Sequence, residues 1–88
     1  MKVRFSPDFD KQFSIRLNKR EQIKVIDTIE LFQDDPFRKD LRNHPLNGKW
    51  LGHRSISIGG DLRLHFKMLD EDIAYFVAVG SHYQLYRQ

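Results

Sequence analysis

Histidine, arginine and aromatic side chains gather in the second half of the chain, where they could act together on a phosphate group. The chain has four histidines: His44, His53, His65 and His82. Histidine transfers protons near neutral pH because its unperturbed pKa is about 6.5. The planar guanidinium of arginine binds two phosphate oxygens at once. The segment GSHYQLY, residues 80–86, also places two tyrosines and a leucine beside His82. Chain ends are usually polar and loosely ordered, so this composition indicates a tail that docks on the domain and takes part in its function.

Alternation of apolar and polar residues predicts which of these side chains share a face of a sheet. In segment 62–68 one side is apolar and consists of Leu62, Leu64, Phe66 and Met68. The other side consists of Arg63, His65 and Lys67. A three-residue loop, Gly59-Gly60-Asp61, joins this segment to the run 50–58. That loop length places Ser57 opposite Arg63, Ser55 opposite His65 and His53 opposite Lys67.

The last predicted strand, 73–79, follows a four-residue loop at 69–72. Under that register Tyr75 and Val77 join the apolar face. The small Ala74 and Ala78 and the flat ring of Phe76 then join the polar face. If the chain stays extended beyond Gly80, His82 and Tyr86 reach the polar face as well.

The predicted polar face is basic and interleaved with aromatic rings. Such a surface suits single-stranded nucleic acid, because cations meet the phosphates and rings stack on the bases. An ordinary solvated sheet face remains the alternative, since antiparallel sheets often leave one side in water. Arg54 has the parity of the apolar face, which places it beyond the packed region or next to a bulge.

The elements that must position these residues are a short strand and two helices, followed by three strands. Residues 2–6 alternate as a strand does. Ser6 and Pro7 are typical of a helix start, with Phe9, Phe13 and Leu17 on one face. Asn18 and Glu21 have capping-box spacing and predict a second helix that ends near Pro36. Its predicted apolar stripe consists of Ile23, Val25, Ile26, Ile29 and Phe32.

This order predicts an α+β fold of the type β-α-α-β-β-β, a small antiparallel sheet with two N-terminal helices packed on one face. Asn47-Gly48 marks a tight turn before the stranded half. Residues 37–45 read as a charged connection with room for one helical turn. With 88 residues, the whole chain, 1–88, is expected to form a single domain.

Composition narrows the function classes. The chain is 40% hydrophobic and 31% charged, with a formal net charge of +3, which indicates a globular protein that favours an acidic partner. It has no cysteine, so disulfides and thiolate metal sites are excluded. The four histidines show no i, i+4 pair, so we expect no metal site and no cofactor. No apolar run approaches the roughly 20 residues that span a membrane, so the expected location is the cytoplasm, without a membrane partner.

Three segments, HPLNGKWLGHRS, GDLRLHFK and VGSHYQLY, stand in an order and spacing that resemble motifs of a known family. The chain resembles the RelE/ParE superfamily of toxins from bacterial type II toxin–antitoxin systems, with the RelE/StbE and YafQ branches the most similar. The resemblance is strongest from His44 to Tyr86. It implies the same fold, a small sheet with two helices on one face, and it implies a ribosome-dependent endoribonuclease that cleaves messenger RNA in the A site.

The resemblance also implies roles for individual residues. His82 matches the C-terminal catalytic histidine, and Arg63 occupies an arginine position that faces the scissile phosphate in other branches. His44 and Asp61 match active-site residues of the YafQ branch. The expected substrate-binding residues are Arg54, Lys67, His65, Tyr86, Ser57 and Phe76. The chain departs from the YafQ pattern in having Ser57 in place of a histidine and Leu62 in place of a tryptophan.

The chemistry implied by the resemblance needs few parts. The 2′-hydroxyl of the messenger RNA attacks the adjacent phosphorus, leaving a 2′,3′-cyclic phosphate and a free 5′-hydroxyl. A base takes the 2′ proton, an acid protonates the leaving oxygen, and cations stabilise the charge on the phosphate. The expected partners are a cognate antitoxin, the ribosome and messenger RNA, with operator DNA reached only through the antitoxin complex. Two alternatives remain, a non-catalytic ParE-like toxin that binds DNA gyrase and a nucleic-acid-binding module without cleavage activity.

Overall fold

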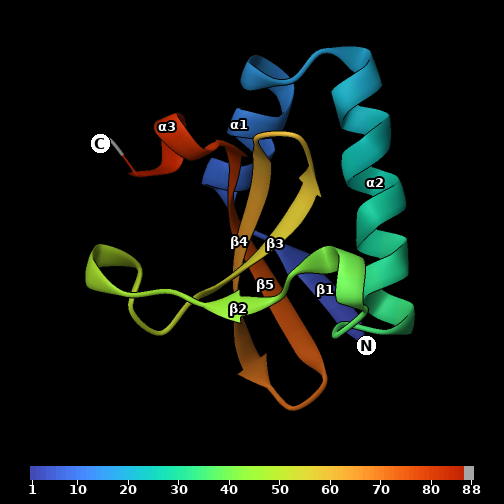
Figure 1. Cartoon of the computed structure of the whole chain (residues 1–88), viewed down its shortest axis with the longest axis vertical. Helices are drawn as coiled ribbons and strands as arrows, with labels where there is room; N and C mark the ends of the chain where they lie inside the picture. Colours follow the sequence, from blue (N-terminus) through green and yellow to red (C-terminus); the bar gives the residue numbers. More distant parts are fainter. Residues whose placement is uncertain (87–88) are drawn as a thin grey trace.

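A five-stranded sheet with two helices on one face forms the body of the protein in a computed structural model that describes residues 1–86 (Figure 1). The strands are β1 (Lys2–Phe5), β2 (His44–Pro45), β3 (Arg54–Gly59), β4 (Leu62–Asp70) and β5 (Ile73–Ser81). The helices are α1 (Pro7–Arg16), α2 (Lys19–Asp34) and α3 (His82–Tyr86), with 3₁₀ turns at Lys39–Leu41 and Gly48–Trp50. The strand order is β1-β5-β4-β3-β2. The α+β prediction is confirmed, while β2 and α3 were not predicted.

The pairing of β1 corrects the expectation of a purely antiparallel sheet. The register Val3↔Ala74 and Phe5↔Phe76 is parallel, whereas β2, β3, β4 and β5 pair antiparallel. The α1–α2 hairpin separates β1 from the later strands along the chain. That long connection allows a parallel crossover, which a tight turn cannot provide.

Both long helices begin where the sequence predicts. The Phe9 amide donates to Ser6 Oγ at 2.9 Å at the start of α1. At the start of α2 the Glu21 amide donates to Asn18 Oδ1 at 2.8 Å, and the Asn18 amide donates to Glu21 Oε1 at 2.9 Å. This reciprocal capping box satisfies two amides that the helix itself leaves unpaired. The helix α2 ends at Asp34, two residues before Pro36.

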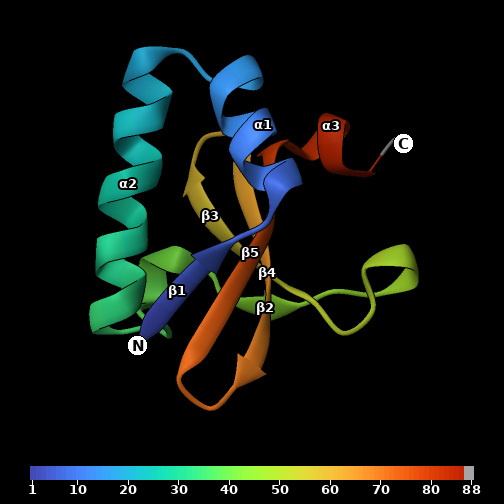
Figure 2. The ribbon, with the colours of Figure 1, turned by 180° about the vertical axis from the view of Figure 1, so that it is seen from behind.

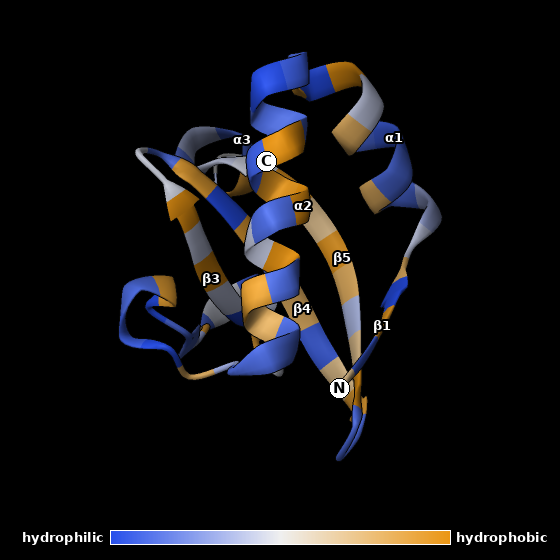
Figure 3. Ribbon diagram, turned by 90° about the vertical axis from the view of Figure 1, so that its right-hand side faces the viewer, coloured by the Kyte–Doolittle hydropathy of each residue, from blue (hydrophilic) through white to orange (hydrophobic). Residues whose placement is uncertain are grey.

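Aromatic rings from the helices and the sheet form the centre of the core. The Phe32 ring of α2 lies 4.9 Å from the Phe66 ring and 5.4 Å from the Phe76 ring, both edge-on. The core consists of Phe9, Leu17, Val25, Ile29, Phe32, Leu41, Ile56, Leu64, Phe66, Ala74, Phe76 and Val79. Figure 3 shows α2 lying across the sheet, with apolar and polar segments alternating along it.

Two members of the predicted α2 stripe lie outside this core. Ile23 is 52% exposed and Ile26 is 50% exposed. The buried side chains of α2 are Val25, Thr28, Ile29 and Phe32, which follow the spacing of a single helical face. Ile26 falls beside that face and Ile23 on the opposite side of the helix, so the buried stripe runs in a different direction from the predicted one.

The placement of Phe76 and Ala74 on the polar face is wrong. Both side chains are fully buried in the core under the helices. The turn between β4 and β5 is shorter than predicted, because Asp70 pairs with Ile73, and the register shifts between Met68 and Asp70. A second shift, between His65 and Phe66, leaves Val77 as an extra residue in β5. Each bulge reverses the parity, so Phe76 faces the core, whereas Ala78 shares the face of His65, as predicted.

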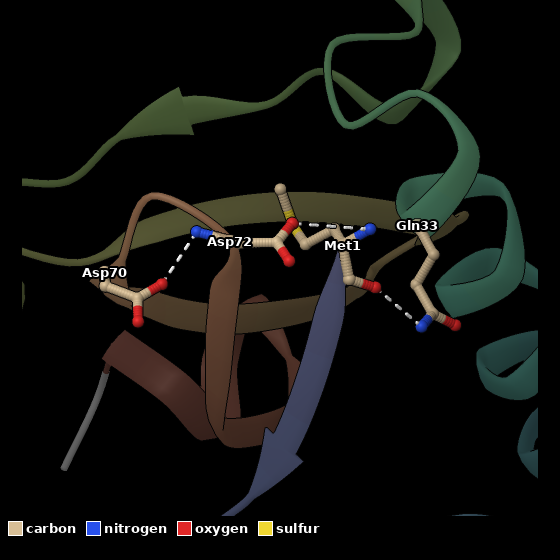
Figure 4. Close-up of polar contacts among 4 residues, drawn as sticks. All are labelled: Met1, Gln33, Asp70 and Asp72. Carbon is tan, nitrogen blue, oxygen red and sulfur yellow. Dashed lines mark hydrogen bonds and ion pairs between the residues drawn. The ribbon is translucent and has the colours of Figure 1, made fainter.

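The chain start is tied to α2 and to the β4–β5 turn (Figure 4). The Gln33 amide group donates to the Met1 carbonyl at 3.0 Å, and the Met1 amino group lies 3.7 Å from Asp72 Oδ1. The Asp72 amide donates to Asp70 Oδ1 at 2.7 Å within the turn. These contacts hold the edge strand β1 against β5 at the end of the sheet away from α3.

The sheet face opposite α2 is covered by different elements. Seen from the front and from behind, α2 lies on one side of the sheet, and α3 lies on the other side with the loop that carries the Gly48–Trp50 turn (Figures 1 and 2). None of the described helices has the length and apolar character needed to cross a lipid bilayer.

Candidate active site

A row of side chains crosses the sheet on the face away from α2. His44 of β2 pairs with Ser55 of β3, Ser55 pairs with His65 of β4, and His65 pairs with Ala78 of β5. Directly opposed residues on neighbouring strands share a face and lie within side-chain reach of one another. The row therefore forms the floor of a site, and the predicted pair of Ser55 and His65 is confirmed.

This floor is not a solvated surface. Ser55, His65 and Ala78 are all at most 2% exposed. The Trp50 ring covers His65 edge-on at 4.4 Å and approaches the His53 ring at 5.4 Å. The alternative of an ordinary solvated sheet face does not hold in this region, because the loop before β3 and the C-terminal helix fold back over the middle of the sheet.

Trp50 also joins the two covering elements. Its indole Nε1 donates to the backbone carbonyl of Leu85 at 3.1 Å, and Leu85 is 3% exposed. The burial of Leu85 therefore anchors the tail on the sheet. Trp50 and its role as a cover were missed by sequence reasoning, although it is the only tryptophan in the chain and lies in a polar segment, where a large aromatic side chain signals a contact.

The tail is helical rather than extended. Ser81 and Gln84 form a capping box, in which the Gln84 amide donates to Ser81 Oγ at 3.1 Å and the Ser81 amide donates to Gln84 Oε1 at 2.8 Å. The spacing Ser-x-x-Gln is a helix-start signal that the sequence carries. In the helix His82 and Tyr86 are four residues apart on one face, and their rings lie 4.4 Å apart. The predicted extended path is wrong, but both side chains still meet on this side of the sheet.

The start of α3 is attached to the β3–β4 turn. The His82 amide donates to the Asp61 carbonyl at 3.2 Å. The Asp61 residue is exposed in that turn, and His82 is exposed at the start of α3. An added Cβ at Gly80 would lie 2.7 Å from Gln84 Oε1 and 2.9 Å from an Arg16 nitrogen, so a larger residue there would displace both side chains. The hydrogen bond to Asp61 therefore brings His82 next to the turn that precedes Arg63.

The Arg63 side chain lies half-buried at this same end of the sheet. Its Nη1 atom donates to the carbonyls of Gly60 and Leu62, both at 2.9 Å, and lies 3.4 Å from Ser57 Oγ. Ser57 and Gly80 flank Arg63 on the neighbouring strands, as predicted for Ser57. The turn carbonyls orient one side of the guanidinium and leave its fixed charge near α3.

Burial determines the protonation of the inner part of the site. It lowers the pKa of His65 to about 4, helped by the charges of His53, His44 and His82. Burial also raises the pKa of the Tyr86 phenol, opposed by the positive charge of Arg63. His65 is therefore neutral at physiological pH, so it is not a cation for binding phosphate. The exposed His82 is better placed to exchange protons with a substrate.

Three residues predicted for substrate binding lie elsewhere. Phe76 is in the core on the opposite face. Arg54 is also on the α2 side, where Nε donates to Asn43 Oδ1 at 2.7 Å and the guanidinium lies 5.5 Å from the Phe37 ring. Lys67 shares the face of His65 but lies two residues further along β4, with its Nζ 6.0 Å from the Tyr75 ring.

The residues that the fold does bring together are His44, Ser57, Asp61, Arg63, His65, His82 and Tyr86. Among residues 1–86 no three histidine or carboxylate side chains are placed to hold a metal ion. A fixed cation beside an exposed histidine can stabilise a phosphate and move a proton at it. Acid–base chemistry on a phosphodiester is thus the chemistry that this arrangement suits.

A protein-family model described as a bacterial toxin of type II toxin–antitoxin systems, YafQ, matches residues 1–87. No curated protein sequence gives a significant match. The chain is also similar in fold to solved structures of bacterial toxins. A crystal structure of YafQ from Escherichia coli strain BL21(DE3) superposes with a TM-score of 0.80 at 22% identity, covering 97% of each chain.

Two further structures show the same fold. A YoeB/ParE toxin from Agrobacterium tumefaciens has a TM-score of 0.76 at 21% identity, covering 94% of this chain and 100% of that one. The Escherichia coli DinJ–YafQ complex gives a TM-score of 0.71 at 23% identity, covering 97% of each chain. At these identities the structural likeness establishes the architecture, a mixed sheet with helices on one face.

Proposed function

The chain belongs to the YafQ family of toxins from bacterial type II toxin–antitoxin systems, and from this membership we propose that it is a metal-independent endoribonuclease. Its proposed substrate is messenger RNA in the A site of the ribosome, and its proposed effect is the arrest of translation. Residues 1–88 would act as one toxin domain in the cytoplasm, where translation takes place.

One observation carries this proposal. The hydrogen bond from the His82 amide to the Asp61 carbonyl, at 3.2 Å, holds the exposed His82 next to the turn that precedes the partly buried Arg63. Arg63 also lies close enough to α3 for its charge to oppose the rise in the Tyr86 pKa. A proton carrier and a fixed cation on one side of the sheet are the parts that phosphodiester cleavage needs.

In the proposed reaction the RNA supplies its own nucleophile. The 2′-hydroxyl oxygen forms a bond to the adjacent phosphorus while a base takes its proton. The bond from phosphorus to the 5′ oxygen breaks, and an acid protonates that oxygen. The products are a 2′,3′-cyclic phosphate and a 5′-hydroxyl, so no cofactor and no oxidant enters the balance.

We assign His82 to one of the two proton transfers and Arg63 to the phosphate. The guanidinium would place its free nitrogens on the non-bridging oxygens, where charge builds up in the transition state. His44 is a candidate for the other proton transfer. It is exposed at the edge of the row, and its Nδ1 is 2.7 Å from the Arg42 carbonyl, which holds the ring in place.

Asp61 and Ser57 would have supporting roles. The Asp61 carbonyl fixes the start of α3, and its exposed carboxylate is free to orient His82 or the RNA. Ser57 stands where YafQ-like chains carry a histidine, and it contacts the Arg63 guanidinium at 3.4 Å. This serine cannot carry a proton as histidine does, so the second transfer would fall to His44 or to a group on the ribosome.

The proposed protein partner is a cognate antitoxin. Escherichia coli YafQ has been crystallised with DinJ, and a Staphylococcus aureus YoeB with YefM. This chain exposes several large apolar side chains on its helical side, which a partner could bury: Phe5, Ile15, Ile23, Ile26 and Leu31. Its net positive charge of +3 favours an acidic partner, and operator DNA would be reached only through such a complex.

Expression of the chain alone in bacteria tests the proposal. We expect growth arrest and new messenger-RNA 5′ ends within translated regions, both suppressed by co-expression of the antitoxin encoded beside it. For the Arg63→Ala variant, Arg20→Ala is the matched control, since it removes one exposed arginine from the first turn of α2, outside the site. Arrest without new 5′ ends would refute RNA cleavage and favour a toxin that acts by binding.

A further inference from the structure

His65 is enclosed as completely as the apolar core, although its ring carries two polar nitrogens. Its side chain is 0% exposed. The Trp50 ring lies 4.4 Å away, edge-on at 84°, and the Tyr86 ring lies 5.2 Å away. Ser55 and Ala78 flank it on the neighbouring strands. Burying the ring nitrogens of a histidine costs desolvation free energy, so the polar contact that the ring makes needs an explanation.

The polar contact of His65 is with the C-terminal helix. His65 Nε2 lies 3.1 Å from the Tyr86 hydroxyl. Its other nitrogen, Nδ1, has no hydrogen-bond partner among the described residues. Burial lowers the pKa of His65 to about 4 and raises that of Tyr86, so the two groups meet as a neutral pair. His65 therefore does not carry the proton in the reaction at neutral pH.

Tyr86 lies between His65 and His82. The Tyr86 hydroxyl contacts the buried His65, and the Tyr86 ring lies 4.4 Å from the His82 ring at an interplanar angle of 37°. The helix that carries both residues has only five residues, too few for a stable helix without external contacts. The position of His82 thus depends on the contacts that α3 makes with the sheet, of which the His65–Tyr86 hydrogen bond is one.

We propose that His65 is a positioning residue for the cleavage reaction. It holds the Tyr86 hydroxyl by a hydrogen bond and, through the Tyr86 ring, fixes the His82 imidazole where it meets the RNA. This inference rests on the proposed function for its effect on cleavage, but the link itself is a property of the free protein. An apolar side chain at position 65 would fill the space and leave the Tyr86 hydroxyl without its partner.

A double-mutant cycle on two readouts tests the link. The variants are His65→Leu, which removes the ring nitrogens, Tyr86→Phe, which removes only the hydroxyl, and the double variant. His65→Gln offers a polar group near the position of Nε2. Tyr75→Phe is the matched control, because it removes a tyrosine hydroxyl from a neighbouring site on β5 without touching the His65–Tyr86 pair.

The first readout is the rate of cleavage of ribosome-bound message. His65→Leu and Tyr86→Phe are each expected to lower kcat by about 10- to 100-fold with little change in KM, since a small misplacement of a reacting group costs rate rather than binding. The double variant is expected to be no slower than the slower single variant, and His65→Gln to recover part of the loss. Losses that multiply in the double variant would overturn the proposal.

The second readout is the NMR chemical shift of the His82 ring protons, which depends on the ring current of the nearby Tyr86 side chain. This measurement needs no RNA. The signal is expected to shift in His65→Leu and in Tyr86→Phe, and to stay in place in Tyr75→Phe. An unshifted signal in folded Tyr86→Phe would refute the link, and that variant serves even if His65→Leu does not fold. A wild-type protein that fails to cleave would refute the proposed function alone, because the NMR result does not depend on cleavage.

Discussion

At the scale of single residues, the proposed site separates exposed groups, which are placed to meet a substrate, from enclosed groups that hold them. His82 is exposed, Arg63 is half-buried, and His65 is fully enclosed. The parity of β4 correctly predicted that Arg63 and His65 share a face. Parity could not predict their difference in exposure, which results from Trp50 and α3 folding over one and leaving the other open.

Arg63 is expected to be essential for cleavage. Arg63→Ala should lower the rate by about 10²-fold or more, in the range seen when a single donor to a developing negative charge is removed. Arg63→Lys should recover little, because an ammonium group cannot reproduce the planar pair of donors. Growth inhibition and cleavage assays measure this effect. A folded Arg63→Ala variant that remains fully toxic would contradict the assignment.

His82 is expected to act in proton transfer. His82→Ala should lower cleavage by roughly 10²–10⁴-fold with little change in thermal stability, because the side chain is exposed. Single-turnover cleavage and thermal unfolding, measured on the same preparation, distinguish the two possible roles. A large loss of stability with an unchanged rate would show that His82 only packs the tail.

His65 makes the folding stability depend on pH. Its pKa is lowered from 6.5 to about 4 in the folded protein, so between these values the unfolded chain binds the proton more readily. The contribution of neutral His65 to the free energy of unfolding is therefore fully present above about pH 6.5. It is lost as the pH drops toward 4, by at most about 3 kcal/mol.

Urea unfolding at pH 7, 5 and 4 measures this dependence. The His65→Leu variant should lose less stability than the wild type over that range, whatever its stability at pH 7. The exposed Asp40, whose hydrogen bond with Arg38 lowers its pKa, contributes equally to both proteins. Identical pH dependence in the two proteins would contradict the assignment of a buried, neutral His65.

At the scale of elements, local signals predicted what local contacts determine. The cap at Ser6 was predicted from the adjacent Pro7 and the cap at Asn18 from Glu21 three residues later, and both are confirmed. The capping box at Ser81 and Gln84 belongs to the same class of signal. It was overlooked because the extended parity of β5 was continued past Gly80, and this error concealed α3.

Sheet register was harder to predict, because it depends on contacts between distant segments. The pair Ser57 and Arg63 was correct, whereas Phe76 was assigned to the wrong face. Two bulges, at Leu69 and Val77, each displaced the alternation by one residue. Phe76 packs against Phe32 and Phe66 in the core. These contacts join distant segments, so the alternation along one strand cannot predict them. Alternation therefore predicted that Ser57, Arg63 and His65 share a face, but it did not predict that Trp50 and α3 cover part of that face.

The α3 capping box is expected to be needed for activity. Ser81→Ala should destabilise the protein by about 0.5–2 kcal/mol and speed amide exchange in residues 82–86, since the Gln84 amide loses its acceptor. Cleavage should fall with it, because His82 begins the helix. Ser14→Ala is the matched control, since Ser14 Oγ donates to the Asp10 carbonyl on the exposed side of α1. Equal effects of the two changes would argue against a special role for the α3 cap.

At the scale of the whole molecule, the sheet separates two surfaces with different roles. One face is covered by α1 and α2 and forms the core. The other carries the candidate site beneath Trp50 and α3 (Figures 1 and 2). A chain of 88 residues buries a small core, so its stability is modest and a bound partner would add to it. The proposed reaction has few catalytic groups on this chain, and the family resemblance implies a histidine where Ser57 stands, so we expect the reaction to need the ribosome.

The most direct test compares the same message on and off the ribosome. Purified wild-type protein and His82→Ala are incubated with a message held in the ribosomal A site and with the same RNA after removal of protein and ribosomes, and the product ends are mapped. We predict cleavage by the wild type only on the ribosome, with 2′,3′-cyclic phosphate ends, and a loss of roughly 10²-fold or more in His82→Ala. Equal cleavage of the naked RNA, or wild-type rates in His82→Ala, would contradict a ribosome-dependent nuclease built around His82.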